Sequence, residues 1–151
     1  MIRSILVPVD GSEHSAKALM LAVDIAEKYD ANLSVLFVAS HEIDGDIHHF
    51  AVTEYSSEYI PKYGRVVREV SENIGKRTIK RMIDKLKTNV VINPVVLSGN
   101  PAEQIVEYSM NNNFDMVIMG NRGLSDIKGM MMGSVSRRVR RLVKCTFVSI
   151  K

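Results

Sequence analysis

The amino-acid sequence predicts one α/β domain, built on a mostly parallel sheet that helices cover on both faces. Apolar strand-like segments alternate with helix-like segments, which is the order that right-handed strand–helix–strand crossovers produce. The first segment, residues 2–9, is apolar almost throughout, as expected of a parallel strand buried on both faces. A length of 151 residues is typical of one domain, so we expect a single domain over residues 1–151.

The composition places the chain among ordinary globular proteins. Hydrophobic residues make up 46% and charged residues 25%, which argues against the disordered and membrane classes. The apolar run from Ile5 to Val9 is too short for the core of a signal peptide. Cys145 is the only cysteine, which excludes an intramolecular disulfide and fits a reducing compartment. We therefore expect a cytoplasmic protein.

The first half of the chain reads as strand, helix, strand and a long excursion. Asp10, Gly11 and Ser12 supply a turn and a helix N-cap. The helix that follows carries its apolar side chains at helical spacing, at Ala16, Leu19, Met20, Val23 and Ala26. Asn32–Val38 is predicted to be the second strand. Residues 39–63 lose all periodicity, which indicates a long surface excursion.

The middle of the chain predicts a long helix and an edge strand. Helical spacing resumes over residues 66–86, although Gly75 costs roughly 1 kcal/mol relative to alanine and marks a kink or a break. Residues 90–97 are rich in β-branched side chains and predict the third strand. Because Pro94 cannot donate to a sheet ladder, this strand should lie at an edge.

The last third predicts two more helices and two more strands. Asn100, Pro101 and Glu103 combine an N-cap, a first-turn proline and an acid in the first turn. Residues 116–119 form a short apolar strand, a helix carries Val135 and Val139 on one face, and residues 146–150 form the fifth strand.

A glycine-rich loop joins the fourth strand to the last helix. In open α/β sheets ligands bind beyond the carboxyl ends of the strands, and the next helix N-terminus offers free N–H groups that suit a phosphate. Gly120, Gly123 and Gly133 would let the backbone approach such a ligand, and the hydroxyls of Ser134 and Ser136 can donate to phosphate oxygens. The spacing matches neither the P-loop nor the dinucleotide fingerprint.

The spacing Gly-x2-Gly-x9-Gly-Ser, at Gly120, Gly123, Gly133 and Ser134, resembles that of ATP-binding universal stress proteins. The resemblance extends to LVPVDGSEHSAKAL, LSVLFV, GNPAEQIVEYS and DMVIMGNRG, in the same order along the chain. It implies an open, doubly wound, Rossmann-like sheet of the adenine nucleotide alpha hydrolase type, with the strand order 3-2-1-4-5. The predicted edge position of the third strand agrees with this order.

The resemblance also implies a nucleotide site and a partner. Asp10 would contact the adenosine part, the backbone near Val38 would meet adenine, and the other residues would surround the base, ribose and phosphates. The implied nucleotide-binding residues are Pro8, Val9, Asp10, Val38, Met119, Gly120, Arg122, Gly123, Gly133, Ser134, Val135 and Ser136. The expected function is that of a regulatory protein of the stress response that binds ATP, with Mg²⁺, and forms a homodimer through its last strand.

Three other interpretations compete with this one. A slow ATPase or phosphotransferase would need a base beside the phosphate loop, and the sequence offers no convincing one. The basic segment SRRVRRLVK, residues 136–144, suggests nucleic-acid binding, but it lacks interleaved aromatics for stacking; Arg137 in it could also reach a phosphate. The histidines and acids of residues 41–49 match no ligand spacing of a metal site, which favours a solvated loop.

Overall fold

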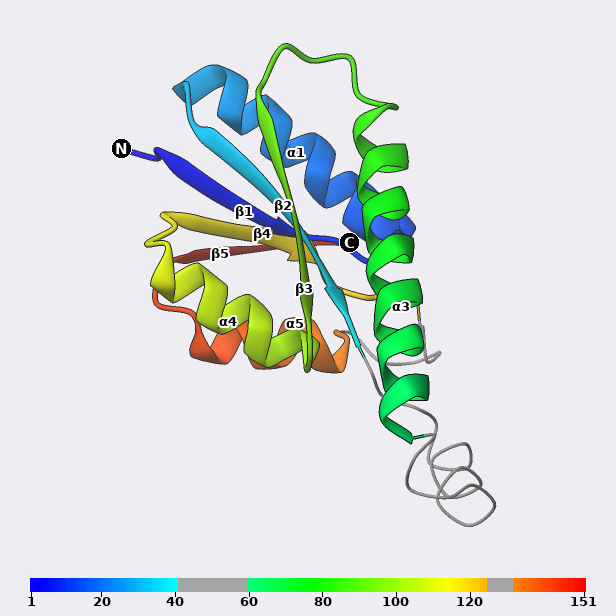
Figure 1. Ribbon diagram of the computed structural model, residues 1–151. Coiled ribbons are helices and arrows are strands. Elements are labelled where there is room, and N and C mark those ends of the chain that lie inside the picture. The colour runs from blue at the N-terminus through cyan, green and yellow to red at the C-terminus, as the bar shows by residue number, and fades with distance from the viewer. Residues whose placement is uncertain (41–59, 125–131) are drawn as a thin grey trace.

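Five parallel strands form the sheet in the order β3-β2-β1-β4-β5, which confirms the predicted topology. The computed structural model describes residues 1–40, 60–124 and 132–151. Figure 1 shows the sheet with β1 near its centre and β3 and β5 at its edges. The strands are β1 (Ser4–Pro8), β2 (Asn32–Ala39), β3 (Ile92–Ser98), β4 (Met116–Gly120) and β5 (Thr146–Ile150).

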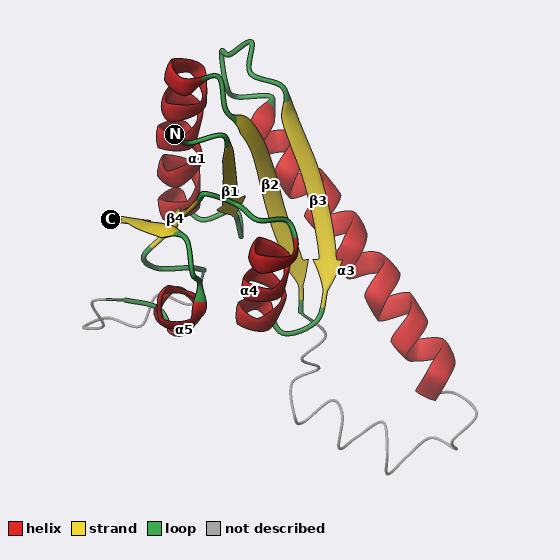
Figure 2. Cartoon of the chain, turned by 90° about the vertical axis from the view of Figure 1, so that its left-hand side faces the viewer, coloured by secondary structure: helices red, strands yellow, loops and turns green. Residues whose placement is uncertain are grey.

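Helices lie on both faces of the sheet, as the alternating pattern predicts. The described residues contain α1 (Glu13–Tyr29), α3 (Ile60–Ile83), α4 (Pro101–Asn111) and α5 (Ser134–Leu142). The first two pack on one face and the last two on the other, as Figures 1 and 2 show. No helix in these parts of the chain is both long and apolar enough to cross a membrane.

The two faces of the sheet form two separate cores. Ile5 and Val7 of β1 point to the core beneath α1 and α3, where they meet Leu19 and Ile79. Leu6, between them, points to the core beneath α4 and α5. Alternate side chains of one strand are therefore buried on opposite faces, which explains why the consecutive residues Ile5, Leu6 and Val7 of β1 are all apolar.

The helix starts are those that the sequence predicts. The Ser12 hydroxyl accepts a hydrogen bond from the Ser15 backbone N–H at 3.2 Å, and α1 begins at the next residue, Glu13. The Asn100 side chain accepts one from the Glu103 N–H at 3.2 Å, with Pro101 opening α4. Each cap therefore begins a helix shortly after the carboxyl end of a strand, β1 for α1 and β3 for α4.

Pro94 lies in the edge strand β3, as predicted. The Gly99 N–H donates to the Ala39 carbonyl, so the odd-numbered residues of β3 turn their backbone groups towards β2. In a parallel ladder the groups of alternate residues point the other way. The missing N–H of Pro94 would therefore face the open edge, where the ladder needs no donor.

Helix α3 differs from the prediction at two points. It begins at Ile60 and not at residue 66, because Pro61 in its first turn is compatible with a helix start. It also runs through Gly75 as one continuous helix, so the expectation of a break there is wrong. Of the expected excursion over residues 39–63, Ala39 ends β2 and residues 60–63 belong to α3, while residues 41–59 lie outside the described residues.

Candidate functional site

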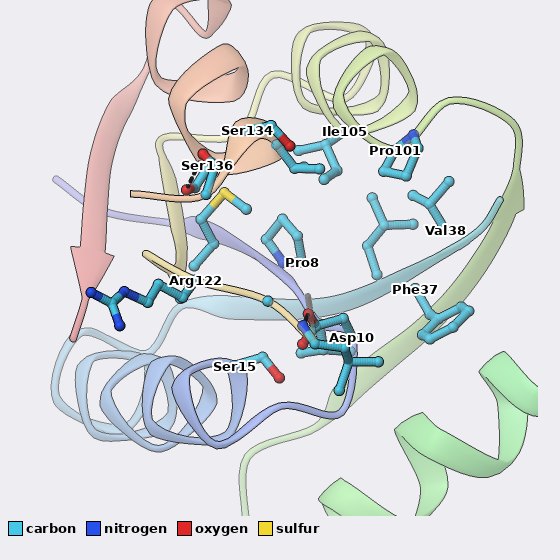
Figure 3. A pocket seen from close by; sticks show the side chains of 18 of the residues that line it. Pro8, Asp10, Ser15, Phe37, Val38, Pro101, Ile105, Arg122, Ser134 and Ser136 are labelled. Carbon is cyan, nitrogen blue, oxygen red and sulfur yellow. Dashed lines mark hydrogen bonds between the residues drawn. The ribbon is translucent and has the colours of Figure 1, made fainter. Parts of the chain in front are cut away.

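A pocket of about 510 Å³ lies at the carboxyl ends of β1, β2 and β4. Chain connections leave this edge of the sheet in opposite directions, because β1 lies between β2 and β4 in the strand order. The first turns of α4 and α5 close the pocket on one side, and the turn after β1 closes it on the other (Figure 3). This is the switch point at which open α/β sheets bind ligands.

The structure brings all the predicted site residues to this pocket. They come from four separate segments that are up to 128 residues apart, counting from Pro8 to Ser136. The predicted residues that line it are Pro8, Val9, Asp10, Val38, Met119, Gly120, Arg122, Gly123, Gly133, Ser134, Val135 and Ser136.

One half of the pocket is apolar. Val38 of β2 lies beside Pro101 and Ile105 of α4, and Pro8 lies between this group and the other half (Figure 3). Leu36 of β2 also lines the pocket. Ile105 is 3% exposed and is held in the core beneath α4 and α5. This half suits a flat apolar group such as a purine base.

The other half of the pocket meets the N-terminus of α5. Gly133 is the N-cap of this helix and provides no side-chain cap, so the first backbone N–H groups are available to an anion. The Ser134 side chain is exposed at the pocket. The Ser136 hydroxyl is buried and lies 3.0 Å from the Asn121 carbonyl and 3.1 Å from the Gly133 carbonyl, to which it donates. In this arrangement Ser136 fastens the helix start to the end of β4.

The Asp10 carboxylate joins the two loops that border the pocket. Its Oδ1 accepts a hydrogen bond from the Ser12 N–H at 2.9 Å, within the turn that follows β1. Its Oδ2 accepts one from the Leu124 N–H at 3.1 Å, in the glycine-rich loop. Asp10 therefore holds the start of the glycine-rich loop against the start of α1.

Two glycines of the loop pattern differ in what surrounds them. A Cβ on Gly123 would lie 2.6 Å from Asp10 Oδ2, so a side chain there would displace the carboxylate. A Cβ on Gly133 would lie no closer than 3.5 Å to its neighbours, at the Asn121 carbonyl oxygen, which is an ordinary contact. The observed position of the Asp10 carboxylate thus requires glycine at Gly123, whereas the surroundings of Gly133 leave room for a Cβ.

Among the described residues, three charged ones line the pocket: Asp10, Arg122 and Arg137. Arg137 was noted in the sequence as able to reach a phosphate, and the structure places it at the α5 side of the pocket. The guanidinium groups and the α5 dipole make this half suitable for an anion, while the carboxylate is suited to accept from hydroxyls.

Two further sequence hypotheses concern a metal site and a nucleic-acid surface. Within the described residues no group of three or more histidine, cysteine or acidic side chains could hold a metal ion, and residues 41–49 lie outside those residues. Of the arginines on α5, Arg138 donates to Glu103 at 2.8 Å, while Arg140 and Arg141 are exposed and do not line the pocket.

Sequence reasoning missed the apolar residues that other elements contribute. Pro101 and Ile105 reach the pocket because α4 starts beside β2 after the crossover from β3. The predicted N-cap at Asn100 was the available signal, since it placed the first turn of α4 at the same edge of the sheet. Phe37 and Ser40 line the pocket from the end of β2.

Known proteins resemble this chain over its whole length. The sequence pattern of the universal stress protein family matches residues 1–151. The chain is 28% identical over 151 residues to universal stress protein YxiE of Bacillus subtilis, covering 100% of both chains. The structure of UspA from Lactobacillus plantarum superposes with a TM-score of 0.75 at 20% identity and covers 99% of this chain and 97% of that one.

Two solved structures of similar fold contain nucleotides. A universal stress protein family protein from Arabidopsis thaliana with AMP bound has a TM-score of 0.67 at 18% identity, covering 99% of this chain and 91% of its own. A universal stress protein in complex with cAMP has a TM-score of 0.62 at 23% identity, with 99% and 96% covered. With the family pattern matched from the first residue to the last, the chain belongs to the universal stress protein family.

Proposed function

We propose that this protein binds ATP in the pocket at the carboxyl ends of β1, β2 and β4 and acts as a regulatory protein of the stress response. The observation that carries the proposal is the division of the pocket. An apolar half between β2 and α4 adjoins a half formed by the uncapped N-terminus of α5, with Arg137 on the same helix. A purine base and a phosphate chain have this same division.

In this proposal the base lies between Val38 and Ile105, with Pro8 and Val9 beneath it. Backbone groups near the end of β2 read the edge of adenine. The AMP and cAMP in the two similar structures are adenine nucleotides, which supports a nucleotide of this class as the ligand.

The phosphates lie at the first turn of α5. The N–H groups of Ser134–Ser136 open the helix beside the pocket, while the Gly133 N–H donates to the Asn121 carbonyl at 2.7 Å. Gly133 itself lets a phosphate approach the backbone. Asp10 is the carboxylate that lines the pocket among the described residues. Since a Mg²⁺ ion often takes its ligands from nucleotide phosphates and water, the metal would enter with the nucleotide.

Asp10 connects binding to the shape of the loop. A ribose hydroxyl that donates to Asp10 Oδ2 would share this oxygen with the Leu124 N–H, from which it accepts at 3.1 Å. In this proposal bound nucleotide links the start of the glycine-rich loop to α1 through Asp10, and partners that contact this loop distinguish the bound state from the free one.

Titration calorimetry of nucleotide-stripped protein with Mg-ATP tests the proposal. We expect saturable binding that weakens at least tenfold in Gly133→Val, because the added side chain occupies the approach of the phosphate. The variant should still unfold in one cooperative transition, about 1 kcal/mol less stable than the parent chain, because the added Cβ meets only ordinary contacts but valine is a poorer N-cap than glycine.

Two outcomes would refute the proposal: no saturable binding by the folded, stripped chain, or equal affinity in the parent chain and Gly133→Val. Release of inorganic phosphate in the same samples distinguishes a binding protein from a slow ATPase. We expect release to stay near background because the pocket presents no base besides Asp10 among the described residues.

We further propose that the protein forms a homodimer through β5. This strand pairs only with β4, so its outer edge is open in the described chain. An open edge of five residues can pair with the same edge of a second copy.

A further inference from the structure

Arg137 extends along the rim of the pocket, in front of the N-terminus of α5. It is the fourth residue of the helix, and long helical side chains run back towards the helix N-terminus. Its Nη2 accordingly donates to the Met132 carbonyl at 3.3 Å, outside the helix and five residues earlier in the chain. The guanidinium group therefore lies beyond Ser134, on the solvent side of the first turn.

The hydrogen bond that holds Arg137 can be exchanged for a stronger one. It is long, and its acceptor is a neutral carbonyl, whereas a guanidinium binds phosphate oxygens through shorter, charge-assisted and often bidentate hydrogen bonds. The next arginine, Arg138, is already paired with Glu103 at 2.8 Å. No carboxylate in the described part of the chain forms such an ion pair with Arg137.

The charges in the pocket determine where a phosphate chain can run. Asp10 repels phosphate from the α1 side, while the N-terminus of α5 attracts it on the opposite side. With a first phosphate at the N–H groups of Ser134–Ser136, the Arg137 guanidinium, which lies at the Met132 carbonyl outside the helix, remains for the part of the phosphate chain beyond it. Only a ligand with additional phosphates extends that far.

Building on the proposed function, we propose that Arg137 determines the specificity of the pocket for the length of the phosphate chain. Its guanidinium contacts the outer phosphates of a nucleoside triphosphate and makes no contact with a monophosphate. The pocket itself binds either nucleotide through the base and first phosphate, so Arg137 adds affinity for ATP alone.

Separate titrations with ATP and AMP, at one ionic strength, test this role. In the parent chain we expect ATP to bind more tightly than AMP. Arg137→Gln should weaken ATP binding about tenfold, the size expected for losing charge-assisted contacts at an exposed site. The affinity for AMP should change less than twofold, so the variant loses most of the preference for ATP over AMP.

Arg141→Gln is the matched control. It removes the same charge from the same helix, at an exposed residue that does not line the pocket. We expect its ATP and AMP affinities to equal those of the parent chain, which excludes a general effect of net charge.

Different results overturn different claims. If the parent chain binds both nucleotides but Arg137→Gln leaves their affinity ratio unchanged, the role of Arg137 is refuted and nucleotide binding stands. An equal loss of ATP and AMP affinity in Arg137→Gln also refutes it, because Arg137 would then contact the first phosphate. If the folded parent chain binds neither nucleotide, both proposals fail.

Discussion

Gly75 allows α3 to pack closely on the sheet. A Cβ built on this buried glycine would lie 2.6 Å from the Phe37 ring of β2, which is closer than real Cβ atoms approach. Glycine is unfavourable within a helix, but at this position it is the residue that allows the close contact with the sheet. Phe37 also lines the pocket, so the same contact fixes a wall of the candidate site.

Two glycine substitutions in α3 should have opposite effects. Gly75→Ala should lower the free energy of unfolding by about 1 kcal/mol, because overpacking costs about 1–3 kcal/mol and the helix propensity returns up to about 1 kcal/mol. Gly64→Ala should raise it by about 0.5–1 kcal/mol, since no atom lies within 4 Å of the added Cβ. Urea unfolding measures both. Equal stabilisation by the two substitutions would show that the contact between α3 and Phe37 does not require glycine at position 75.

The sequence predicts local features of the backbone but not contacts between residues that are distant along the chain. The caps at Ser12 and Asn100 and the edge position of Pro94 were predictable, because each depends on the local backbone. The contact of Gly75 with Phe37 was not, since it joins residues 38 positions apart through side-chain packing. The hydrogen bond from the Leu124 N–H to Asp10 spans 114 positions and was equally inaccessible.

At the scale of the element, the backbone of β5 offers a specific test of the proposed dimer. The Thr146 N–H donates to the Asp115 carbonyl, and the Ile150 carbonyl accepts from the Asn121 N–H. The even-numbered residues therefore bond to β4, while Phe147 and Ser149 turn their backbone groups to the open edge.

Ser149→Pro should abolish dimerisation and keep the monomer folded. Proline at this exposed position removes an N–H that points away from β4, so the ladder between β4 and β5 stays intact. Sedimentation equilibrium should show a monomer for Ser149→Pro and a dimer for Ser149→Ala. A dimer that persists in Ser149→Pro with unchanged affinity would place the interface elsewhere.

At the scale of the whole molecule, Asp115 fastens the start of β4 to the start of β1. Its Oδ2 accepts from the backbone N–H of Arg3 at 2.8 Å and of Ser4 at 3.0 Å, and from the Ser4 hydroxyl at 3.2 Å. The hydrogen bond from the Arg3 N–H is the main cause that lowers the pKa of this carboxyl, with the Ser4 donors adding to it. These contacts join residues more than 110 positions apart.

The lowered pKa of Asp115 predicts a loss of stability in acid. The native state favours the carboxylate, so its contribution is complete above the pKa of the unfolded chain and disappears as the pH falls through the lower native value. Asp115→Asn should be less stable than the parent chain at pH 7, and the difference should shrink between about pH 5 and pH 2. Urea unfolding across this range measures it. A difference that stays constant with pH would show that the charge of Asp115 contributes nothing.

The central position of β1 also sets the order in which this molecule can be completed. The strands β1, β2 and β3 are neighbours in the sheet and come from the first 98 residues, whereas β4 must close a loop of more than 110 residues before Asp115 reaches Arg3. During synthesis the pocket residues of β1 and β2 are therefore in place before those of β4 and α5. A ligand that contacts residues from both parts of the chain binds only after β4 and α5 have docked, so it stabilises the completed fold and slows its unfolding.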